Sequence, residues 1–485
     1  MKKRIAVALL CLALVGAMTA CNLADFEFGG LVGELLGSGE LIEPGILPPD
    51  VTPPPDVWGE DVTMGPGEQL YGFPDALELK GDIVICESED TLLLSDATSP
   101  EMLNEAVVGL ETQFAELYGH SVYHKIMPTE LALELALSET MAGTGMPVLC
   151  YLPLSAAGEV AVSGTFHSNQ SLSDFELDNG CWFDGLNADL QLADGTQYSF
   201  AGFLTPYTQL DVDCMVYSDR KMQELGVNMP ATVYDGLWTL DTFLSLSEQN
   251  KIDLNGDGQF GEDDFYGALF DTDTYKELIF DNSGIRIFEQ TEIQTDALQL
   301  CTDLFHQLTE LEEMTCRSEV AEQLFYKERA LFYATRLSHY AGLDGYSAMM
   351  TNSEFPVCVV PMPVYSKGAE HVATSRNGAV LSIARSGQGD LGMTLNVLAV
   401  LAANHMMPAV EACVYRVNPT EDSARMSYYV MERAHCDLMR TVLRAQGYAC
   451  DPMEKDPVSF FEANRAKLEK AIKKLYDATQ KNHAN

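Results

Sequence analysis

The chain has 485 residues, of which 47% are hydrophobic, and its formal net charge is −43. A surface this acidic repels nucleic acid and anionic lipid, so the composition excludes a protein that binds either through a basic patch. After the N-terminal segments, about 400 residues remain, which is enough for two domains of ordinary size.

Residues 1–21 have the features of a targeting segment. Residues 2–4 are basic, and residues 5–20 are apolar apart from Thr19, over a length that is short for a bilayer span. The segment ends in "MTAC", which resembles a bacterial lipobox and implies cleavage before Cys21 and a lipid on its sulfur. An ordinary secretory signal with a chance cysteine is the alternative. Loss of the three basic residues changes the charge from −43 to −46 (−43 − 3).

Residues 22–77 form a spacer rich in glycine and proline, with Pro48, Pro49 and residues 53–55 close together. Such a composition cannot bury a core and favours an extended, semi-rigid chain. We expect this tether to hold the globular part away from the membrane.

The first globular segments alternate between strand and helix. Buried strands are predicted at residues 81–86, 121–127 and 146–154, with helices at 99–119 and 130–145 between them. This alternation predicts a parallel sheet covered by helices.

The later segments continue in mixed α/β style. "CMVYSDRKMQELGV" predicts a strand that runs into a helix, and Thr239 is placed to cap the helix of "LWTLDTFLSLSEQN". "AEQLFYKERALFYATRL" predicts a helix followed by a strand. "SARMSYYVMERAHCDLMRTVL" reads as one long amphipathic helix, and a last helix carries an apolar face that includes Phe461 and Leu475.

The chain has 12 cysteines, and none falls in a C-x-x-C motif or a Cys/His cluster, which argues against a zinc site. Cys86 and Cys358 lie in apolar runs. Buried free thiols are therefore favoured over a disulfide framework.

The stretch "DLNGDGQFGEDD", residues 253–264, has the spacing of a calcium loop. The oxygen ligands fall at loop positions 1, 3, 5, 7 and 12, and Gly258 supplies the turn at position 6. The predicted ligands are Asp253, Asn255, Asp257, Gln259 and Asp264. The glycines also spell G-x-G-x-x-G, but the surrounding acids would repel a phosphate, and no buried strand precedes them. An acidic turn without metal remains the alternative to a structural Ca²⁺ site.

Four stretches in order resemble the extracellular solute-binding proteins of carbohydrate ABC importers, of the kind found lipid-anchored in Gram-positive bacteria. They are "ETQFAELYGHSV", the segment from "VYSDRKMQELGV" to the acidic loop and "DDFYG", "FYKERALFYATRL" and "FPVCVVPMPVYS". The chain departs from the family at Ser218, where an asparagine is usual, and at residues 336–338, where a tryptophan that stacks on sugar is usual.

The resemblance implies a fold of class α/β, the two-lobed, type II periplasmic-binding-protein-like fold, with the ligand in the cleft between the lobes. It places residues 78–208 and 378–438 in lobe 1, and residues 209–377 and 439–485 in lobe 2. It implies a monomer on the extracellular face of the membrane. This monomer would carry a small solute, in the first place a sugar, to the transmembrane subunits of a permease, with no nucleic acid partner.

Candidate ligand contacts are aromatic rings, which stack on sugar faces, and planar polar groups near the expected crossings between lobes. For each residue, packing or a plain turn is the competing interpretation. The candidates are Trp182, Tyr207, Arg336, Tyr340, Arg376 and Asn377.

Two other functions stay open at this point. An extracellular glycoside hydrolase would need two carboxylates that face a cleft, and acids are abundant here. A surface adhesin without a small ligand would need no such cleft. A two-lobed fold, as opposed to an eight-fold barrel, separates the first interpretation from the hydrolase.

Overall fold

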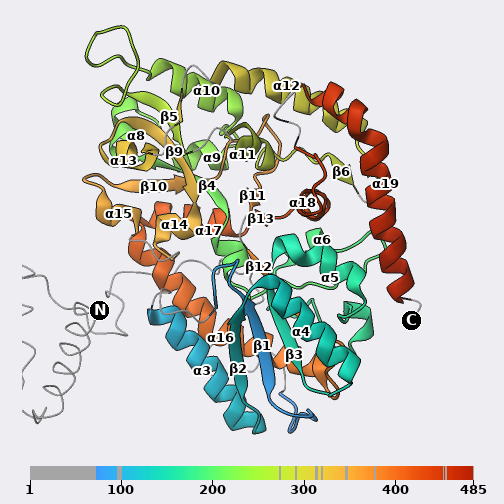
Figure 1. Cartoon of the computed structure of the whole chain (residues 1–485). Coiled ribbons are helices and arrows are strands. Elements are labelled where there is room, and N and C mark those ends of the chain that lie inside the picture. Colours follow the sequence, from blue (N-terminus) through green and yellow to red (C-terminus); the bar gives the residue numbers. More distant parts are fainter. Residues whose placement is uncertain are drawn as a thin grey trace, which may run out of the picture. The chain divides into compact units, whose positions relative to one another are not determined.

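The computed structural model describes residues 73–94, 101–271, 275–289, 292–311, 315–317, 320–343, 348–375, 378–451, 453 and 456–483 (Figure 1). The signal segment, Cys21, nearly all of the tether, and the pair Arg376 and Asn377 lie outside these residues. The predictions made for them are therefore not addressed by the fold.

Lobe 1 is built on a four-stranded sheet with the order β12-β3-β1-β2. Its strands are β1 (Ile83–Ser88), β2 (Val122–Met127), β3 (Val148–Pro153) and β12 (Ala379–Ile383). β1 is parallel to β2 and β3, as predicted, but β12 is antiparallel to β3. The sheet is therefore mixed, because β12 comes from the chain on its return from lobe 2 and enters in the opposite direction.

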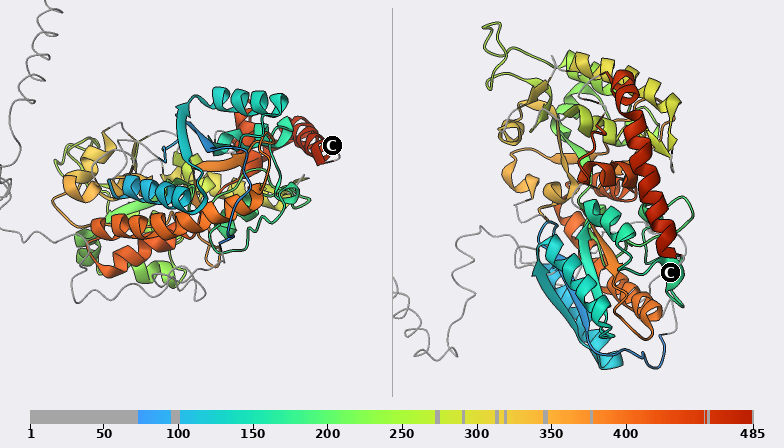
Figure 2. Two further views of the ribbon diagram at one scale, coloured as in Figure 1. Left: turned by 90° about the horizontal axis from the view of Figure 1, so that it is seen from below. Right: turned by 45° about the vertical axis from the view of Figure 1, so that its right-hand side comes forward.

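Helices cover both faces of this sheet (Figure 2). On one face, α3 (Glu101–Tyr118) packs against α16 (Leu391–Val417), and on the other α4 (Thr129–Ala142) packs on β1 and β3. The buried residues of α3 include Leu103, Leu110 and Phe114, which lie on one face at helical spacing. The smaller helices of the lobe are η1 (Leu154–Ala156), α5 (Ala157–Ser163), η2 (Asn169–Ser171) and α6 (Asp184–Leu190).

Within the described part of the chain, α16 is the one helix long and apolar enough to cross a membrane, with a mean hydropathy of 1.5. Of its most apolar window, 67% is buried inside the structure. That burial, and its packing on α3, identify it as a core helix of lobe 1.

Lobe 2 is built on a five-stranded sheet with the order β10-β4-β9-β5-β8. The strands are β4 (Asp213–Ser218), β5 (Tyr266–Phe270), β8 (Thr315–Arg317), β9 (Ala330–Arg336) and β10 (Val357–Val360). β4 is antiparallel to both β9 and β10, whereas β5 is parallel to β8 and β9.

The helices of lobe 2 begin and end close to where their sequence signals predict. Thr239 caps α10 (Leu240–Gln249) by accepting a hydrogen bond from the Thr242 N–H at 3.4 Å, and Trp238 just before it is fully buried. The helices are α8 (Asp219–Leu225), α9 (Met229–Tyr234), α10 (Leu240–Gln249), α11 (Tyr275–Asp281), α12 (Thr295–Leu311), α13 (Ala321–Tyr326), α14 (Leu337–Ala341) and α15 (Met349–Asn352). A short hairpin, β6 (Phe288–Glu289) and β7 (Glu292–Ile293), completes the lobe.

The chain passes between the lobes at segments that pair with one another. It leaves lobe 1 after α7 (Tyr207–Leu210), and Val212 forms a β-bridge with Ser375 of the return segment. Next to this bridge, β11 (Ala373–Thr374) pairs in parallel with β13 (Ala434–His435). The sequence prediction put these two crossings at 208/209 and 377/378, and residue 377 lies outside the described residues.

The predicted third crossing, at 438/439, needs correction. α17 (Glu421–Met431) packs against β10 and α9 of lobe 2, so the chain has already left lobe 1 before this helix. The predicted single helix over residues 423–443 is also wrong, because β13 interrupts it and α18 (Leu438–Ala445) begins anew. Asp437 caps α18 by accepting a hydrogen bond from the Arg440 N–H at 2.9 Å.

The last two helices connect the lobes instead of belonging to lobe 2 alone. α18 packs on η1 and α5 of lobe 1, and α19 (Pro457–His483) contacts α12 of lobe 2 and α5 of lobe 1. Figure 1 shows α19 as the red helix that runs from the level of α12 to the level of α5. The assignment of residues 439–485 to lobe 2 is therefore too simple.

Nine cysteines in the described residues are free and buried, in agreement with the expected thiols. They are Cys86, Cys150, Cys181, Cys214, Cys301, Cys358, Cys413, Cys436 and Cys450.

Candidate functional site

Two adjoining cavities lie between the lobes, next to the crossing segments. The smaller has a volume of about 260 Å³ and the larger about 690 Å³, and they share Arg286, His435 and Asp437. The other residues that line the smaller cavity are Leu154, Ser155, Phe280, Asp281, Ile285, Thr374, Ser375, Arg440, Thr441, Arg444 and Ala445. The larger cavity is lined mainly by residues 188–195, 435–439 and the α19 residues Leu475 and Tyr476.

Local structure explains why these side chains converge. Leu154 and Ser155 follow the carboxyl end of β3, which is where α/β sheets usually present ligand contacts. Arg286 follows α11 of lobe 2, and His435 lies on the short crossing strand β13. The cavities are therefore walled by both lobes and by the crossings, the position that the two-lobed fold predicts for a ligand.

The carboxylate of Asp189, at the end of α6, organises the junction of the two cavities. It accepts hydrogen bonds from Arg286 Nη1 at 3.0 Å, from His435 Nδ1 at 2.6 Å and from the Cys436 N–H at 3.2 Å. Burial acts to raise the pKa of Asp189, but the hydrogen bond and charge of His435, together with the charge of Arg286, outweigh it and lower the pKa. Asp189 is therefore held as an anion.

Arg440 of α18 forms the second charged cluster, at the wall of the smaller cavity. Only 4% of the residue is exposed, and its guanidinium donates to Asp281, to Glu277 Oε2 at 2.5 Å and to Asp451 Oδ1 at 3.0 Å. Burial lowers the pKa of Arg440 below its usual range, although the carboxylates act in the opposite direction. Arg444 donates to the same Asp451, and its side chain stays 43% exposed.

Two buried polar atoms in this wall have no hydrogen-bond partner among the described residues. They are Arg440 Nε and Ser375 Oγ. A buried polar atom that lacks a hydrogen-bond partner destabilises the folded state. If the lobes moved so that a ligand hydroxyl reached either atom, the new hydrogen bond would favour binding. Together with Ser155 and Thr374, they give the cavity the mixed donors and acceptors that hydroxyl-rich molecules require.

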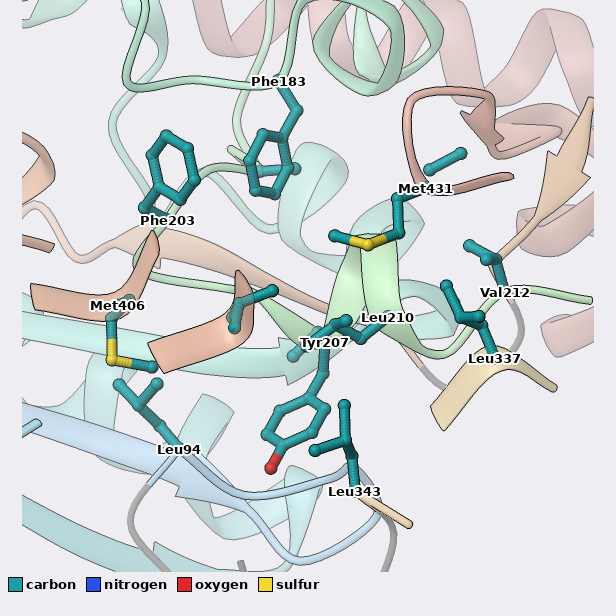
Figure 3. Packing of buried hydrophobic residues seen from close by; sticks show 14 of the residues in the cluster. Leu94, Phe183, Phe203, Tyr207, Leu210, Val212, Leu337, Leu343, Met406 and Met431 are labelled. Carbon is teal, nitrogen blue, oxygen red and sulfur yellow. The ribbon is translucent and has the colours of Figure 1, made fainter. Parts of the chain in front are cut away.

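The aromatic residues predicted to contact ligand have packing roles instead. Trp182 is 3% exposed and packs edge-on against Phe175 and Phe200. Tyr207 is 2% exposed in the apolar core where the lobes meet, and Figure 3 shows its ring beside Leu343.

Tyr340 is fully buried as well. Its hydroxyl donates to the Val357 carbonyl at 3.2 Å or to Asn418 Oδ1 at 2.9 Å. None of these three rings has a free face for stacking, which corrects the sequence prediction.

Arg336 was predicted as a ligand contact but is engaged at the first crossing. Its Nη1 donates to both carboxylate oxygens of Asp211, at 2.8 and 3.1 Å, and Ser338 Oγ donates to the same carboxylate at 2.5 Å. Arg336 lines neither cavity. This ion pair instead ties β9 of lobe 2 to the crossing segment.

In the acidic loop, the predicted calcium ligands accept hydrogen bonds from the loop's own backbone. Asp253 accepts from the N–H groups of Gly256 and Gly258, and Asp264 accepts from those of Leu254 and Gly261. In the described part of the chain, no three His, Cys, Asp or Glu side chains are arranged as a metal site. No residue of the loop lines either cavity, and its calcium stays a prediction.

Sequence analysis missed the residues that line the cavities. His435 and Asp437 were placed inside a long helix, because the apolar spacing of residues 423–443 continues across them. Asp437 is a preferred N-cap residue three positions before Arg440, and this was the signal for a new helix. Asp189 and Arg286 lie in segments with no motif, so nothing local marked them.

No protein-family model and no curated protein sequence matches the chain. Among solved structures, the extracellular solute-binding protein of Staphylococcus aureus in complex with maltose aligns with a TM-score of 0.51 at 13% identity. The alignment covers 85% of this chain and 98% of that one. The chain therefore shares the two-lobed α/β fold of that structure.

Two other structures align over similar lengths. One is the cyclic alpha-maltosyl-1,6-maltose binding protein of Arthrobacter globiformis, with 14% identity, 83% and 99% of the two chains covered, and a TM-score of 0.48. The other is the Agrobacterium radiobacter solute-binding protein in complex with ribitol, with 12% identity, 82% and 99% covered, and a TM-score of 0.45. The solute-binding fold assignment rests on the Staphylococcus protein.

Proposed function

We propose that the chain is the solute-binding component of an ABC importer, and that its ligand is an oligosaccharide or a related polyol. The observation that carries this proposal is the pair of cavities, with mixed polar and apolar linings, that both lobes and the crossings wall. In a two-lobed fold, ligand capture couples to hinge closure, and a closed protein is what a permease would receive. The chain would then catalyse no reaction.

The lining favours hydroxyl groups as the recognised chemistry. Arginine and aspartate present planar pairs of donors or acceptors that match vicinal hydroxyls, and Ser155, Thr374 and Thr441 add single hydroxyls. The named solute of the Staphylococcus aureus structure, maltose, is of the same chemical class.

The hydrolase alternative finds less support. A glycosidase needs one carboxylic acid and one free carboxylate on either side of a scissile bond. In these cavities Asp189 is engaged by Arg286 and His435, and Asp281 by Arg440. Burial raises the pKa of Asp437, but this carboxyl caps α18. The two open sheets also differ from the eight-fold barrel that this alternative anticipated.

Thermal unfolding of the full chain in the presence of galactose, ribitol, maltose or maltotetraose tests the proposal. A sugar present at about 100 times its Kd should raise the unfolding temperature by roughly 3 °C or more. No shift with any sugar would reject the importer role and favour the adhesin alternative.

The lipid anchor and the extracellular location belong to the same proposal and are supported by the "MTAC" segment alone. If Cys21 carries the lipid, Cys21→Ala should move the chain from the membrane fraction to the medium. Retention of the variant in the membrane would contradict the anchor.

A further inference from the structure

Asp189 belongs to lobe 1, whereas its partners come from lobe 2 and from a crossing strand. α6 is part of the lobe 1 core through Leu186 and Leu190. Arg286 lies between Ile285 and Ile287, which are both in the lobe 2 core. The 3.0 Å bond between Arg286 Nη1 and Asp189 Oδ1 therefore joins the lobes directly.

His435 strengthens this contact from the crossing side. Its Nδ1 lies 2.6 Å from Asp189 Oδ2, a distance that requires a proton between the two atoms, and its side chain is 10% exposed. The adjacent Cys436 N–H donates to the same oxygen at 3.2 Å. One carboxylate thus accepts hydrogen bonds from three groups that lie outside lobe 1.

The two charged side chains of this contact, Asp189 and Arg286, differ in how far they are exposed to solvent. The Asp189 side chain is 8% exposed, so an opening that removed its partners would leave a poorly hydrated anion until water entered. The Arg286 side chain is 59% exposed and can be hydrated without unfolding. The contact thus joins a buried anion on lobe 1 to a hydrated cation on lobe 2, and it can break without disturbing either core.

The position of the contact relates it to the cavities. Asp189 lines the larger cavity, and Arg286 and His435 line both, so the ion pair lies where the two cavities adjoin. The carboxyl of Asp437 lines both cavities beside Arg286 and His435, and burial raises its pKa.

We propose that Asp189 is the positioning residue of an interlobe latch, which holds Arg286 and His435 against lobe 1 and favours the closed arrangement even without solute. This inference rests on the proposed function, since a latch matters only if the lobes open to admit a ligand. With this latch, the chain without solute already favours the closed arrangement over the open one. A bound solute would then stabilise the closed arrangement further.

The distance between the lobes, measured by double electron–electron resonance, tests the latch without any ligand. Spin labels are attached to the full chain at Glu134→Cys on α4 and Glu248→Cys on α10, both of which are exposed positions. Nine of the native cysteines are buried, and the chain without the two new cysteines gives the labelling background of the others.

Arg286→Gln and Asp189→Asn should each shift the ratio of closed to open populations by about tenfold toward open. Asp189→Asn/Arg286→Gln should open no further than the larger single change, because both remove the same contact. The matched control is Arg425→Gln, which breaks the Arg425–Glu421 ion pair within α17 at 2.6 Å and should leave the distances unchanged.

Identical distance distributions in all chains would overturn the latch, and so would fully additive shifts in the double variant. Arg286 is exposed enough that its variant should unfold at the same temperature as the parent, which separates opening from loss of stability. Failure of the latch leaves sugar binding by the parent chain intact. A different result is also possible: the variants could shift these distances while the parent chain binds no sugar. That result would reject the proposed function and retain the latch.

Discussion

The two lobes meet at two chemically opposite regions. On one side, Tyr207, Leu337, Leu343 and Met431 belong to a continuous apolar core that includes residues of both lobes (Figure 3). On the other side, the contact consists of ion pairs around Asp189 at the junction of two cavities. Apolar packing resists separation in proportion to the area that would be wetted, whereas hydrated arginines can exchange partners at little cost. The difference indicates that the first region acts as a pivot and the second as the part that opens.

The largest expected effect comes from removing a pivot side chain. Tyr207→Ala should lower the free energy of unfolding by about 4 kcal/mol, because it deletes a fully packed ring and leaves a cavity. Urea unfolding followed by circular dichroism measures the loss. Tyr476→Ala is the matched control, since this partly exposed tyrosine lines the larger cavity and should cost below about 1 kcal/mol. Equal losses would erase the distinction between the two regions.

A buried charge lies close to the pivot and should make its stability depend on pH. His124 contacts Glu87 and bonds Glu111 at 2.6 Å, and it lines a small apolar void with Leu94 and Met406. Burial lowers the pKa of His124, but the two carboxylates outweigh this effect and raise it to about 9.

Because the folded pKa lies above the unfolded value of 6.5, the added stability is complete below pH 6.5 and is lost as pH rises through 9. We expect the free energy of unfolding to fall by roughly 3 kcal/mol across that window. His124→Gln should remove this slope. A parent chain whose urea midpoint stays flat from pH 6.5 to pH 9 would contradict the assignment.

The strands and helices of the two lobes were more predictable from the sequence than the residues that line the cavities. Strands β1, β2 and β3 and their helices follow from local apolar periodicity and from caps such as Thr239, which act within a few residues. The cavity residues Asp189, Arg286 and His435 are brought together only by the tertiary fold, from positions about 100 and 150 residues apart in the chain. Tyr207 and Tyr340 were predicted as ligand contacts because they lie near expected crossings. A tyrosine in such a position can equally pack inside the core, and local sequence does not distinguish the two roles.

On the polar side, a change at Arg444 should separate binding from stability. Its side chain is 43% exposed and bonds Asp451, so Arg444→Gln should change the free energy of unfolding by less than about 1 kcal/mol. The same change should weaken binding of the sugar that gives the largest thermal shift by about tenfold. Titration calorimetry measures the affinity, with Arg425→Gln as the control. Unaltered affinity would place the ligand away from this wall.

The smallest expected effect lies outside both regions, in the acidic loop. If residues 253–264 bind calcium, Ca²⁺ at about five times its Kd should stabilise the chain by about 1 kcal/mol. Asp257→Asn should abolish this gain, and Mg²⁺ at the same concentration should not reproduce it. A calcium effect that survives Asp257→Asn would point to another site, and sugar affinity should be unaffected in either case.

The most direct test of the account is calorimetric titration of maltotetraose and the other sugars into the full chain and into Ser155→Trp. Ser155 is exposed on the wall of the smaller cavity, so an indole there should fill the cavity without disturbing a core. The account predicts that at least one sugar binds the parent chain and that Ser155→Trp, which keeps the parent's unfolding temperature, binds it at least tenfold more weakly. Equal affinity for the two chains would show that the interlobe cavity is not the solute site.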